Sequence, residues 1–265
     1  AAFRPHQGED DMTLYVKTAG AGEGAPVVLL HGFGGSHDVW GPIQERLAAE
    51  TATLAYDLPG HGSSFACEGA GPAKVAATAI LVDLEARGIA SAHLVGHSMG
   101  GAIAALMAIF QPQRAASLTL LAPGGFGPQI NQRLLKRYAA AADETALLLC
   151  LEAMFGWFSP VPQGLAAKLL ASRAAPGYRD KLREMAEGLA RDGRQGMLPA
   201  EKLQALTMPV SVVWGGLDNV LPARQAESLP AHYSVRLFPD LGHMLPEEAP
   251  DEMLDIIRHT AGLVR

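Results

Sequence analysis

The chain has 265 residues, 49% of them apolar and 18% charged, which suits one domain, or one domain with an insertion, around a substantial core. The 27 acidic residues outnumber the 21 basic ones, and the basic residues form no run, so we expect neither a nucleic-acid nor a membrane partner. Cys67 and Cys150 make neither a disulfide framework nor a zinc cluster, and no apolar run is long enough to span a bilayer. These features favour a cytoplasmic protein without a metal site.

The N-terminus shows no targeting signal. It lacks the basic start and the apolar centre of a signal peptide. The chain begins with Ala1 where an initiator Met is expected, so we expect that it was processed or cut from a longer protein.

Short apolar segments alternate with longer amphipathic segments over residues 12–125. The apolar segments predict strands at 13–17, 26–30, 53–56, 92–95 and 117–121. Apolar residues spaced by three and four predict helices at 39–50, 73–87 and 99–110. This alternation is typical of an α/β protein with a mostly parallel, twisted sheet flanked by helices.

The strand pattern stops after residue 127 and returns near residue 207. Residues 128–206 are rich in helix-forming Ala, Leu, Arg, Lys and Glu, with prolines as breaks. Strands are then predicted at 209–214 and 234–238, and an amphipathic helix at 246–263. We therefore expect a core of residues 1–127 and 207–265, with residues 128–206 as a helical cap over the crevice at the carboxyl ends of the strands.

A serine stands at the centre of the Gly-x-Ser-x-Gly sequence in GHSMGG, between a predicted strand and a predicted helix. At such a turn Gly96 and Gly100 avoid clashes, and Ser98 projects into the crevice at the helix N-terminus. The alternative is a glycine-rich turn in which Ser98 only caps the helix. The partners described next favour a nucleophile.

A serine nucleophile needs a base, and the base needs an acid that orients it. Asp218 follows the predicted strand at 209–214, and His243 follows the strand at 234–238, which gives the chain order Ser, Asp, His. Asp240 and Glu247 flank the histidine and are alternative acids, which we expect to serve their loop and the last helix.

Three other histidines lie in loops of the predicted site, namely His31, His61 and His97. A residue next to the nucleophile in a tight turn points its side chain away, and the loop DLPGHGSS favours a loop-holding histidine. None of the three has the upstream acid and the downstream position of His243.

Negative charge on a tetrahedral intermediate needs two hydrogen-bond donors. The N–H of Met99, at the helix N-terminus, is one candidate. The N–H of Phe33, in HGFGG after the second predicted strand, is the other, and Gly32 lets the backbone approach closely.

The motifs HGFGG, DLPGHG, GHSMGG, GGLDNVLP and LGHMLPEE occur in this order over nearly the whole chain, which resembles the α/β-hydrolase superfamily. The resemblance implies the α/β-hydrolase fold, with Ser98 as nucleophile, Asp218 as orienting acid, His243 as general base, and Phe33 and Met99 as oxyanion donors. It also implies that dehalogenase and epoxide-hydrolase chemistry are absent, because those relatives carry Asp in place of the serine. No cofactor is expected.

A narrower resemblance lies in LLAPGGFGPQIN, residues 120–131. This stretch is similar to the hydrolase-like domain of the acyltransferase component of acetoin-cleaving complexes. Such proteins carry a lipoyl domain upstream, so the resemblance implies a lipoyl domain or complex partner if the chain is a fragment. It also implies an acyl group passed to a thiol rather than to water.

The expected substrate is a small, apolar molecule. Candidate binding residues are Gly32, Phe126, Phe155 and Trp157, the last two from the aromatic MFGWF sequence of the cap. No Arg or Lys stands in the site loops before Arg114, which favours an uncharged substrate, although the cap also holds Arg133, Lys136 and Arg137.

The simplest reaction is hydrolysis of a carboxylic ester through an acyl-Ser98 intermediate. Acyl transfer to a thiol, C–C bond hydrolysis and cofactor-free perhydrolysis use the same three residues. A cap arginine over Ser98 would favour the C–C hydrolases, whose substrates carry carboxylates. A hypothesis of another class is a catalytically silent binding module, which failure of a fluorophosphonate to label Ser98 would support.

Overall fold

The computed structural model describes residues 14–264, which form an α/β structure around one seven-stranded sheet. The sheet order is β1-β3-β2-β4-β5-β6-β7, and β1 pairs with β3 antiparallel while every other pairing is parallel. The predicted fold class is therefore confirmed. The strands are β1 (Val16–Ala19), β2 (Val27–Leu30), β3 (Thr53–Tyr56), β4 (Ala92–His97), β5 (Ala115–Leu121), β6 (Val210–Gly215) and β7 (Ser234–Phe238).

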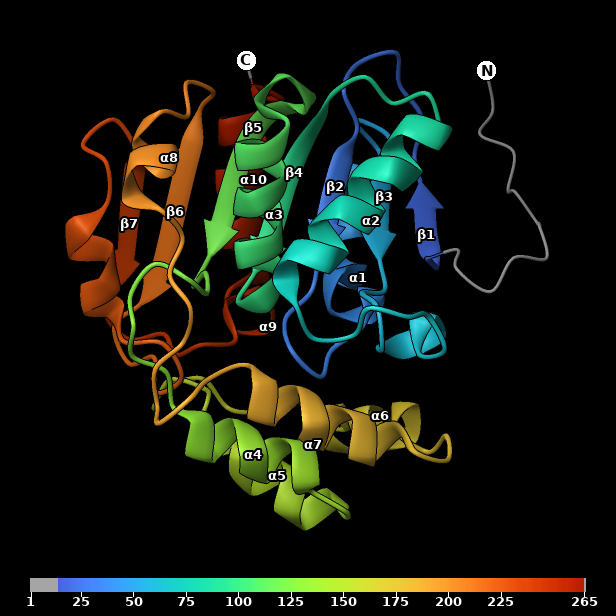
Figure 1. Ribbon diagram of the computed structural model, residues 1–265, viewed down its shortest axis with the longest axis vertical. Coiled ribbons are helices and arrows are strands. Elements are labelled where there is room, and N and C mark those ends of the chain that lie inside the picture. The colour runs from blue at the N-terminus through green and yellow to red at the C-terminus, as the bar shows by residue number, and fades with distance from the viewer. Residues whose placement is uncertain (1–13, 265) are drawn as a thin grey trace.

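Helices cover both faces of the sheet. Figure 1 shows α2 (Ala73–Ala86) and α3 (Met99–Phe110) in front of the strands, and α1 (Gly41–Leu47) and α10 (Pro250–Ala261) behind them. The central strands are buried because both faces are covered, and every residue of β2, β3 and β6 is buried. The remaining helices are α4 (Gln132–Ala140), α5 (Glu144–Glu152), α6 (Leu165–Ser172), α7 (Tyr178–Gly188), α8 (Ala200–Gln204) and α9 (Leu245–Glu248).

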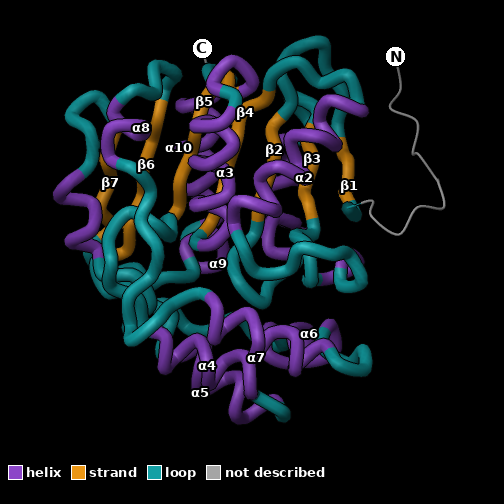
Figure 2. Tube along the Cα trace, in the orientation of Figure 1, coloured by secondary structure: helices purple, strands orange, loops and turns teal. Residues whose placement is uncertain are grey.

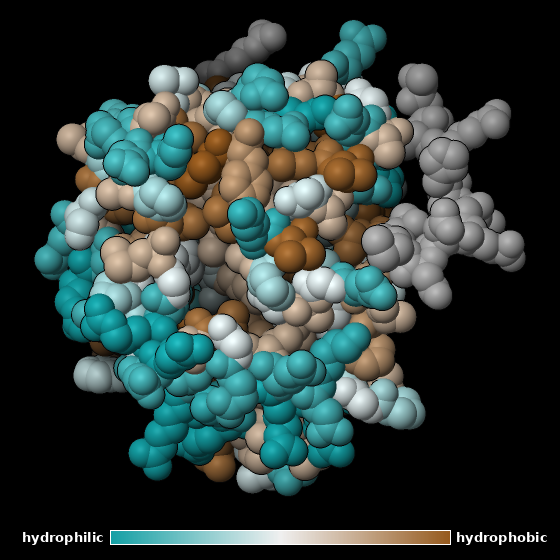
Figure 3. Space-filling model, viewed as in Figure 1, coloured by the Kyte–Doolittle hydropathy of each residue, from teal (hydrophilic) through white to brown (hydrophobic). Residues whose placement is uncertain are grey.

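The residues predicted as a cap contain α4 to α8 and none of the seven strands. Helices α4 to α7 pack on one another beyond the carboxyl ends of the parallel strands, whereas α8 packs on α3 (Figures 1 and 2). The outer side of α4 and α7 is hydrophilic, as Figure 3 shows. No helix among residues 14–264 has both the length and the apolar character needed to cross a membrane.

The chain enters and leaves this helical segment along neighbouring backbones. Gln129 and Arg194 form an isolated β-bridge, and the Gln195 N–H donates to the carbonyl of Pro128 (2.8 Å). The Leu198 N–H likewise donates to the carbonyl of Gly125 (2.8 Å). The segment is therefore an insertion whose two ends meet beside the sheet.

Three predicted elements differ from the structure. The predicted helix 39–50 is a 3-10 helix at His37–Trp40 followed by α1, which ends at Leu47. The first strand is Val16–Ala19 rather than 13–17, because its register with β3 pairs Val16 with Tyr56, and Thr13 lies outside the described residues. The predicted helix 246–263 is two helices, since Ala249 is non-helical (φ −144°, ψ 61°) before Pro250, which lacks an N–H and disfavours helix in the residue before it.

Two helical glycines give a matched test of the packing between α3 and the sheet. A Cβ on Gly100 would overlap the carbonyl oxygen of Leu30, whereas a Cβ on Gly188 would meet nothing within 4 Å. We expect Gly100→Ala to lower the free energy of unfolding by about 1–3 kcal/mol through overpacking. Gly188→Ala should raise it by up to about 1 kcal/mol. Urea denaturation measures both, and an equal effect of the two changes would contradict the close approach.

Candidate active site

Ser98 lies at the turn between β4 and α3 in a strained backbone conformation. Its φ is 53° and its ψ is −114°, which a non-glycine residue rarely adopts. A Cβ on Gly96 would overlap the carbonyl of Gly100, and one on Gly100 would overlap that of Leu30. Glycine at both positions is therefore required for the turn, as the sequence predicts.

Ser98, His243 and Asp218 form a chain of hydrogen bonds. The Oγ of Ser98 lies 3.0 Å from Nε2 of His243, and Nδ1 of His243 lies 2.7 Å from Oδ2 of Asp218. If Nδ1–H donates to the carboxylate, Nε2 is free to accept from the hydroxyl. The arrangement can remove the serine proton while the acid stabilises the charged imidazole.

Asp218 is held by its own loop after β6. Its Oδ1 accepts hydrogen bonds from the N–H groups of Val220 and Leu221, both at 2.8 Å, which leaves Oδ2 for the histidine. The alternative acids Asp240 and Glu247 make no hydrogen bond to His243 in the structure. The geometry therefore brings Asp218, and neither alternative, to the base.

The backbone of His243 is fixed on both sides. Its N–H donates to the carbonyl of Met154 (2.7 Å), and its carbonyl lies 2.8 Å from Nε2 of His97. Burial lowers the pKa of His97 to about 3, so this ring stays neutral and donates through Nε2–H. His97 thus contacts the backbone of the base, whereas the ring that is hydrogen-bonded to the Ser98 hydroxyl is that of His243.

The loop after β2 places Phe33 beside the nucleophile turn. A Cβ on Gly32 would lie 3.0 Å from Nδ1 of His97 and 3.3 Å from Cβ of Ser98, so only glycine allows this approach. Within the described residues, neither the N–H of Phe33 nor that of Met99 donates a hydrogen bond. Both groups are therefore available to an oxyanion at Ser98.

Two buried histidines hold the loops that follow β2 and β3. His31 donates from Nδ1 to the carbonyl of Gly32 (2.7 Å) and accepts at Nε2 from the Leu58 N–H (3.0 Å). Nδ1 of His61 lies 3.1 Å from the carbonyl of Pro59. Burial lowers the pKa of His31 to about 4 and that of His61 to about 3. Both rings are neutral and serve the loops, which agrees with the loop-holding role expected for His61.

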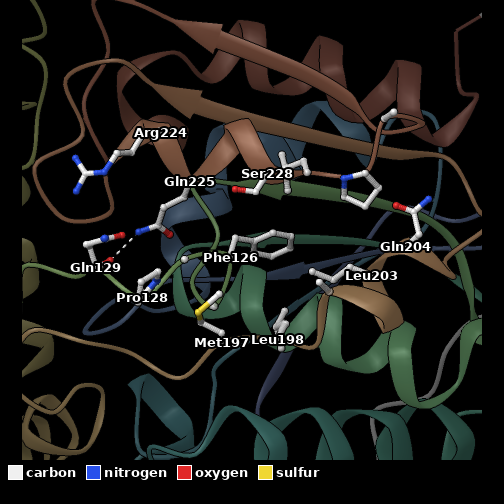
Figure 4. A pocket seen from close by; sticks show the side chains of 16 residues that line it. Phe126, Pro128, Gln129, Met197, Leu198, Leu203, Gln204, Arg224, Gln225 and Ser228 are labelled. Atoms are coloured by element: carbon white, nitrogen blue, oxygen red, sulfur yellow. Dashed lines mark hydrogen bonds between the residues drawn. The ribbon is translucent and has the colours of Figure 1, made fainter.

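The three aromatic candidates for substrate binding lie in different environments. Phe126 is buried and lines a groove of about 350 Å³ with Leu198, Leu203 and Gln225 (Figure 4). Phe155 is buried next to the loop of His243, since a Cβ on Gly242 would overlap its backbone. Trp157 is 80% exposed, so the structure does not bring its indole into a buried pocket.

Arg173 is a cap residue that the sequence motifs do not identify. It follows α6, and only 3% of it is exposed. Its guanidinium donates to the carbonyl of Tyr138 (2.9 Å) and to that of Gly34 (3.4 Å), and lies 4.2 Å from the centre of the Tyr138 ring.

The charge of Arg173 is not neutralised within the described chain. No carboxylate forms an ion pair with it, and its Nε has no hydrogen-bond partner. A buried cation thus contacts Gly34, one residue from Phe33. The only local signal is a single Arg in the otherwise uncharged sequence LLASRAAP, which is too weak to identify it.

No group of three or more His, Cys, Asp or Glu in the part of the chain that the structure describes could hold a metal ion.

A family model described as the alpha/beta hydrolase family matches residues 27–256, and the chain belongs to this family. The dihydrolipoyllysine-residue acetyltransferase component of the acetoin cleaving system of Cupriavidus necator is 35% identical over 98% of this chain. The component of the same name from Pseudomonas putida is 37% identical over 87% of it. The chain spans 70% of the length of the first relative and 61% of the second.

Other relatives of this chain are named for different activities. A pimeloyl-[acyl-carrier protein] methyl ester esterase from Aeromonas salmonicida is 29% identical over 91% of this chain and 97% of its own length. The meta-cleavage product hydrolase of Pseudomonas fluorescens IP01 superposes with a TM-score of 0.81 over 94% of both chains at 20% identity. This last similarity shows the shared fold.

Glu247 gives a test of the electrostatics beside the base. Burial, with a smaller effect of Glu248, raises its pKa to about 8, and its Oε2 has no partner. Between its ordinary pKa of 4.5 and about 8 the folded chain keeps a proton that the unfolded chain releases, so stability falls as pH rises through this window. We expect Glu247→Gln to remove this loss, worth up to about 1.4 kcal/mol per pH unit.

The measurement is the free energy of unfolding in urea at about pH 5 and about pH 8. The free energy of unfolding of Glu247→Gln, relative to that of the unchanged chain, should be higher at about pH 8 than at about pH 5. For the exposed control Glu184→Gln this difference should not change with pH. An advantage for Glu247→Gln that is the same at both pH values would contradict the raised pKa.

Proposed function

We propose that the chain hydrolyses a carboxylic ester, or a related acyl bond, through an acyl-Ser98 intermediate. The observation that carries this proposal is the hydrogen-bonded series from Ser98 to His243 (3.0 Å) and from His243 to Asp218 (2.7 Å). Membership of the alpha/beta hydrolase family and the esterase among its relatives support it.

In the proposed mechanism, Ser98 Oγ attacks the carbonyl carbon while Nε2 of His243 takes its proton. Asp218 stabilises the imidazolium, and the N–H groups of Phe33 and Met99 stabilise the oxyanion. The protonated His243 then gives its proton to the leaving group. Water, activated by the same imidazole, attacks the acyl carbon and releases the acid and free Ser98.

We further propose that residues 128–206 act as a cap on the core formed by residues 1–127 and 207–265. The location of α4 to α7 beyond the carboxyl ends of the strands supports this division. Gly32, Phe126 and Phe155 remain our candidates for contacts with the substrate, and the exposure of Trp157 makes it the weakest of the four predicted residues.

A second candidate function is transfer of the acyl group from Ser98 to a thiol. The two acetoin-system relatives favour it, although this chain corresponds to only part of each. In such a reaction a thiolate replaces water, and a thioester forms in place of the acid. A lipoyl group on a partner would supply the thiol.

Intact-mass spectrometry with a short acyl ester, and separately with an acyl thioester, distinguishes these functions. We expect an acyl adduct on Ser98 that decays to free acid at a rate independent of added dithiol. Decay that accelerates with dithiol and yields its thioester would favour acyl transfer.

Ser98→Ala and His243→Ala are the controls. Both should abolish adduct formation and turnover. Ser98→Ala removes only a hydroxyl and should leave thermal unfolding nearly unchanged, whereas His243→Ala removes a buried imidazole and the partner of Asp218 and should lower the melting temperature. Turnover near that of the unchanged chain in Ser98→Ala would refute the mechanism. Failure of a fluorophosphonate to label Ser98 would favour a binding module without catalysis.

Arg173 bears on the charge of the substrate. A buried guanidinium without a carboxylate partner, next to the oxyanion loop, favours a substrate that carries its own carboxylate. Among the reactions besides ester cleavage, it thereby favours C–C bond hydrolysis of a carboxylate-bearing substrate over perhydrolysis. Helix α4 carries the other cap cations considered in the sequence, which are Arg133, Lys136 and Arg137.

We expect Arg173→Gln to lower kcat/KM for a carboxylate-bearing acyl substrate about 10- to 100-fold more than for its uncharged methyl-ester analogue. The control is Arg179→Gln, which changes an exposed arginine of α7. An equal fall for both substrates would mean that Arg173 only connects the cap to the oxyanion loop.

A further inference from the structure

The carboxylate of Glu248 accepts three backbone hydrogen bonds. Glu248 ends α9, five residues after His243. Its Oε2 accepts from the N–H groups of Gly242 (2.9 Å) and Gly156 (2.8 Å), and its Oε1 accepts from the N–H of Met244 (2.9 Å). Hydrogen bonds to an ionised carboxylate are stronger than those between neutral groups.

Two of these donors flank His243 in the chain. Gly242 precedes the histidine and Met244 follows it, so one carboxylate fixes the peptide groups on both sides. The N–H and the carbonyl of His243 are themselves bonded to Met154 and His97. The N–H groups of residues 242, 243 and 244 therefore all donate hydrogen bonds, which fixes this backbone. The fixed backbone in turn sets the direction of the His243 imidazole toward Ser98.

The third donor, Gly156, belongs to the segment 153–156 that follows α5. A Cβ on Gly156 would overlap the carbonyl of Asp240, and one on Gly242 would overlap that of Met154. The two backbones therefore cross without room for a side chain at either glycine. This crossing lets one carboxylate oxygen reach both N–H groups.

The same segment also contacts the loop of the orienting acid. Asn219, next to Asp218, donates from Nδ2 to the carbonyl of Ala153 (3.1 Å). Residues 153–156 thus connect the loops that carry the acid and the base.

We propose that Glu248 is a positioning residue, which holds His243 toward Ser98 and makes its placement depend on the cap segment 153–156. This inference rests on the proposed function, in which His243 is the base. Glu248 itself moves no proton and contacts no substrate; it acts through the backbone of residues 242–244.

Glutamine at this position gives a graded test. Three N–H donors face the carboxylate, which only accepts, whereas an amide offers one accepting oxygen and one donating NH2. In Glu248→Gln the oxygen can keep Gly156 and Gly242, but the NH2 then faces the N–H of Met244. Glu248→Ala loses all three bonds. The control is Glu252→Gln, at an exposed position in the first turn of α10.

We expect kcat for an ester to fall about 10-fold in Glu248→Gln and about 100-fold in Glu248→Ala, because small displacements of a catalytic group have effects of this size. KM should change by less than about twofold, and the rate of fluorophosphonate labelling should fall in parallel with kcat. Glu252→Gln should match the unchanged chain in all three.

Proton NMR of the His243 Nδ1–H reports the position of the ring without any turnover. The strongly deshielded proton of the bond to Asp218 should be present in the unchanged chain and in Glu252→Gln, and weakened or lost in Glu248→Ala. If the fluorophosphonate does not label Ser98 in the unchanged chain, the proposed function is refuted. Loss of the NMR signal in Glu248→Ala would still support the positioning role of Glu248 in that case. A Glu248→Ala chain that keeps both the signal and kcat, with only a lower melting temperature, would overturn the inference.

Discussion

The close approach of the Ser98 turn to the end of β2 determines where the other parts of the candidate site lie. β2 and β4 are adjacent and parallel, with Leu30 paired to Gly96, so the loops that follow them leave the same edge of the sheet. The start of α3 then packs on the carbonyl of Leu30 with no room for a Cβ on Gly100. As a result Phe33 and Met99, from distant parts of the chain, belong to two segments that meet at the same edge of the sheet. The strained φ of Ser98 is maintained by this packing.

Elements with strong local signals could be predicted from the sequence. The bounds of β3, β7 and α3 agree with the structure, because their apolar patterns end at clear glycine, proline or polar residues. Ser98, Asp218 and His243 come together as predicted, since each follows a strand and the carboxyl ends of parallel strands share an edge. The register of β1 and the break at Pro250 depend on pairing and backbone geometry that periodicity does not report.

Residues that act through tertiary contacts could not be predicted in this way. Arg173 reaches Gly34 across 139 positions of the chain, and Glu248 reaches Gly156 across 92. The residues next to Arg173 and Glu248 in the sequence form no pattern from which these distant partners could be predicted. Trp157 shows the opposite case. The aromatic sequence around it predicts a place in a pocket, whereas its side chain is exposed to solvent. The position of such a side chain depends on how the cap packs on the core, which composition does not encode.

The adjoining backbones of residues 125–130 and 193–198 have a topological consequence. The helical segment starts and ends at neighbouring backbones, so it is one closed loop attached to the core. The entropic cost of closing such a loop rises only slowly with its length. Helices between these two points can be lengthened, exchanged or re-angled while the strand order and the edge that carries Ser98 stay unchanged. Specificity can therefore diverge in a cassette of about 60 residues, provided that residues 153–156 keep their contacts with the loops of Asp218 and His243.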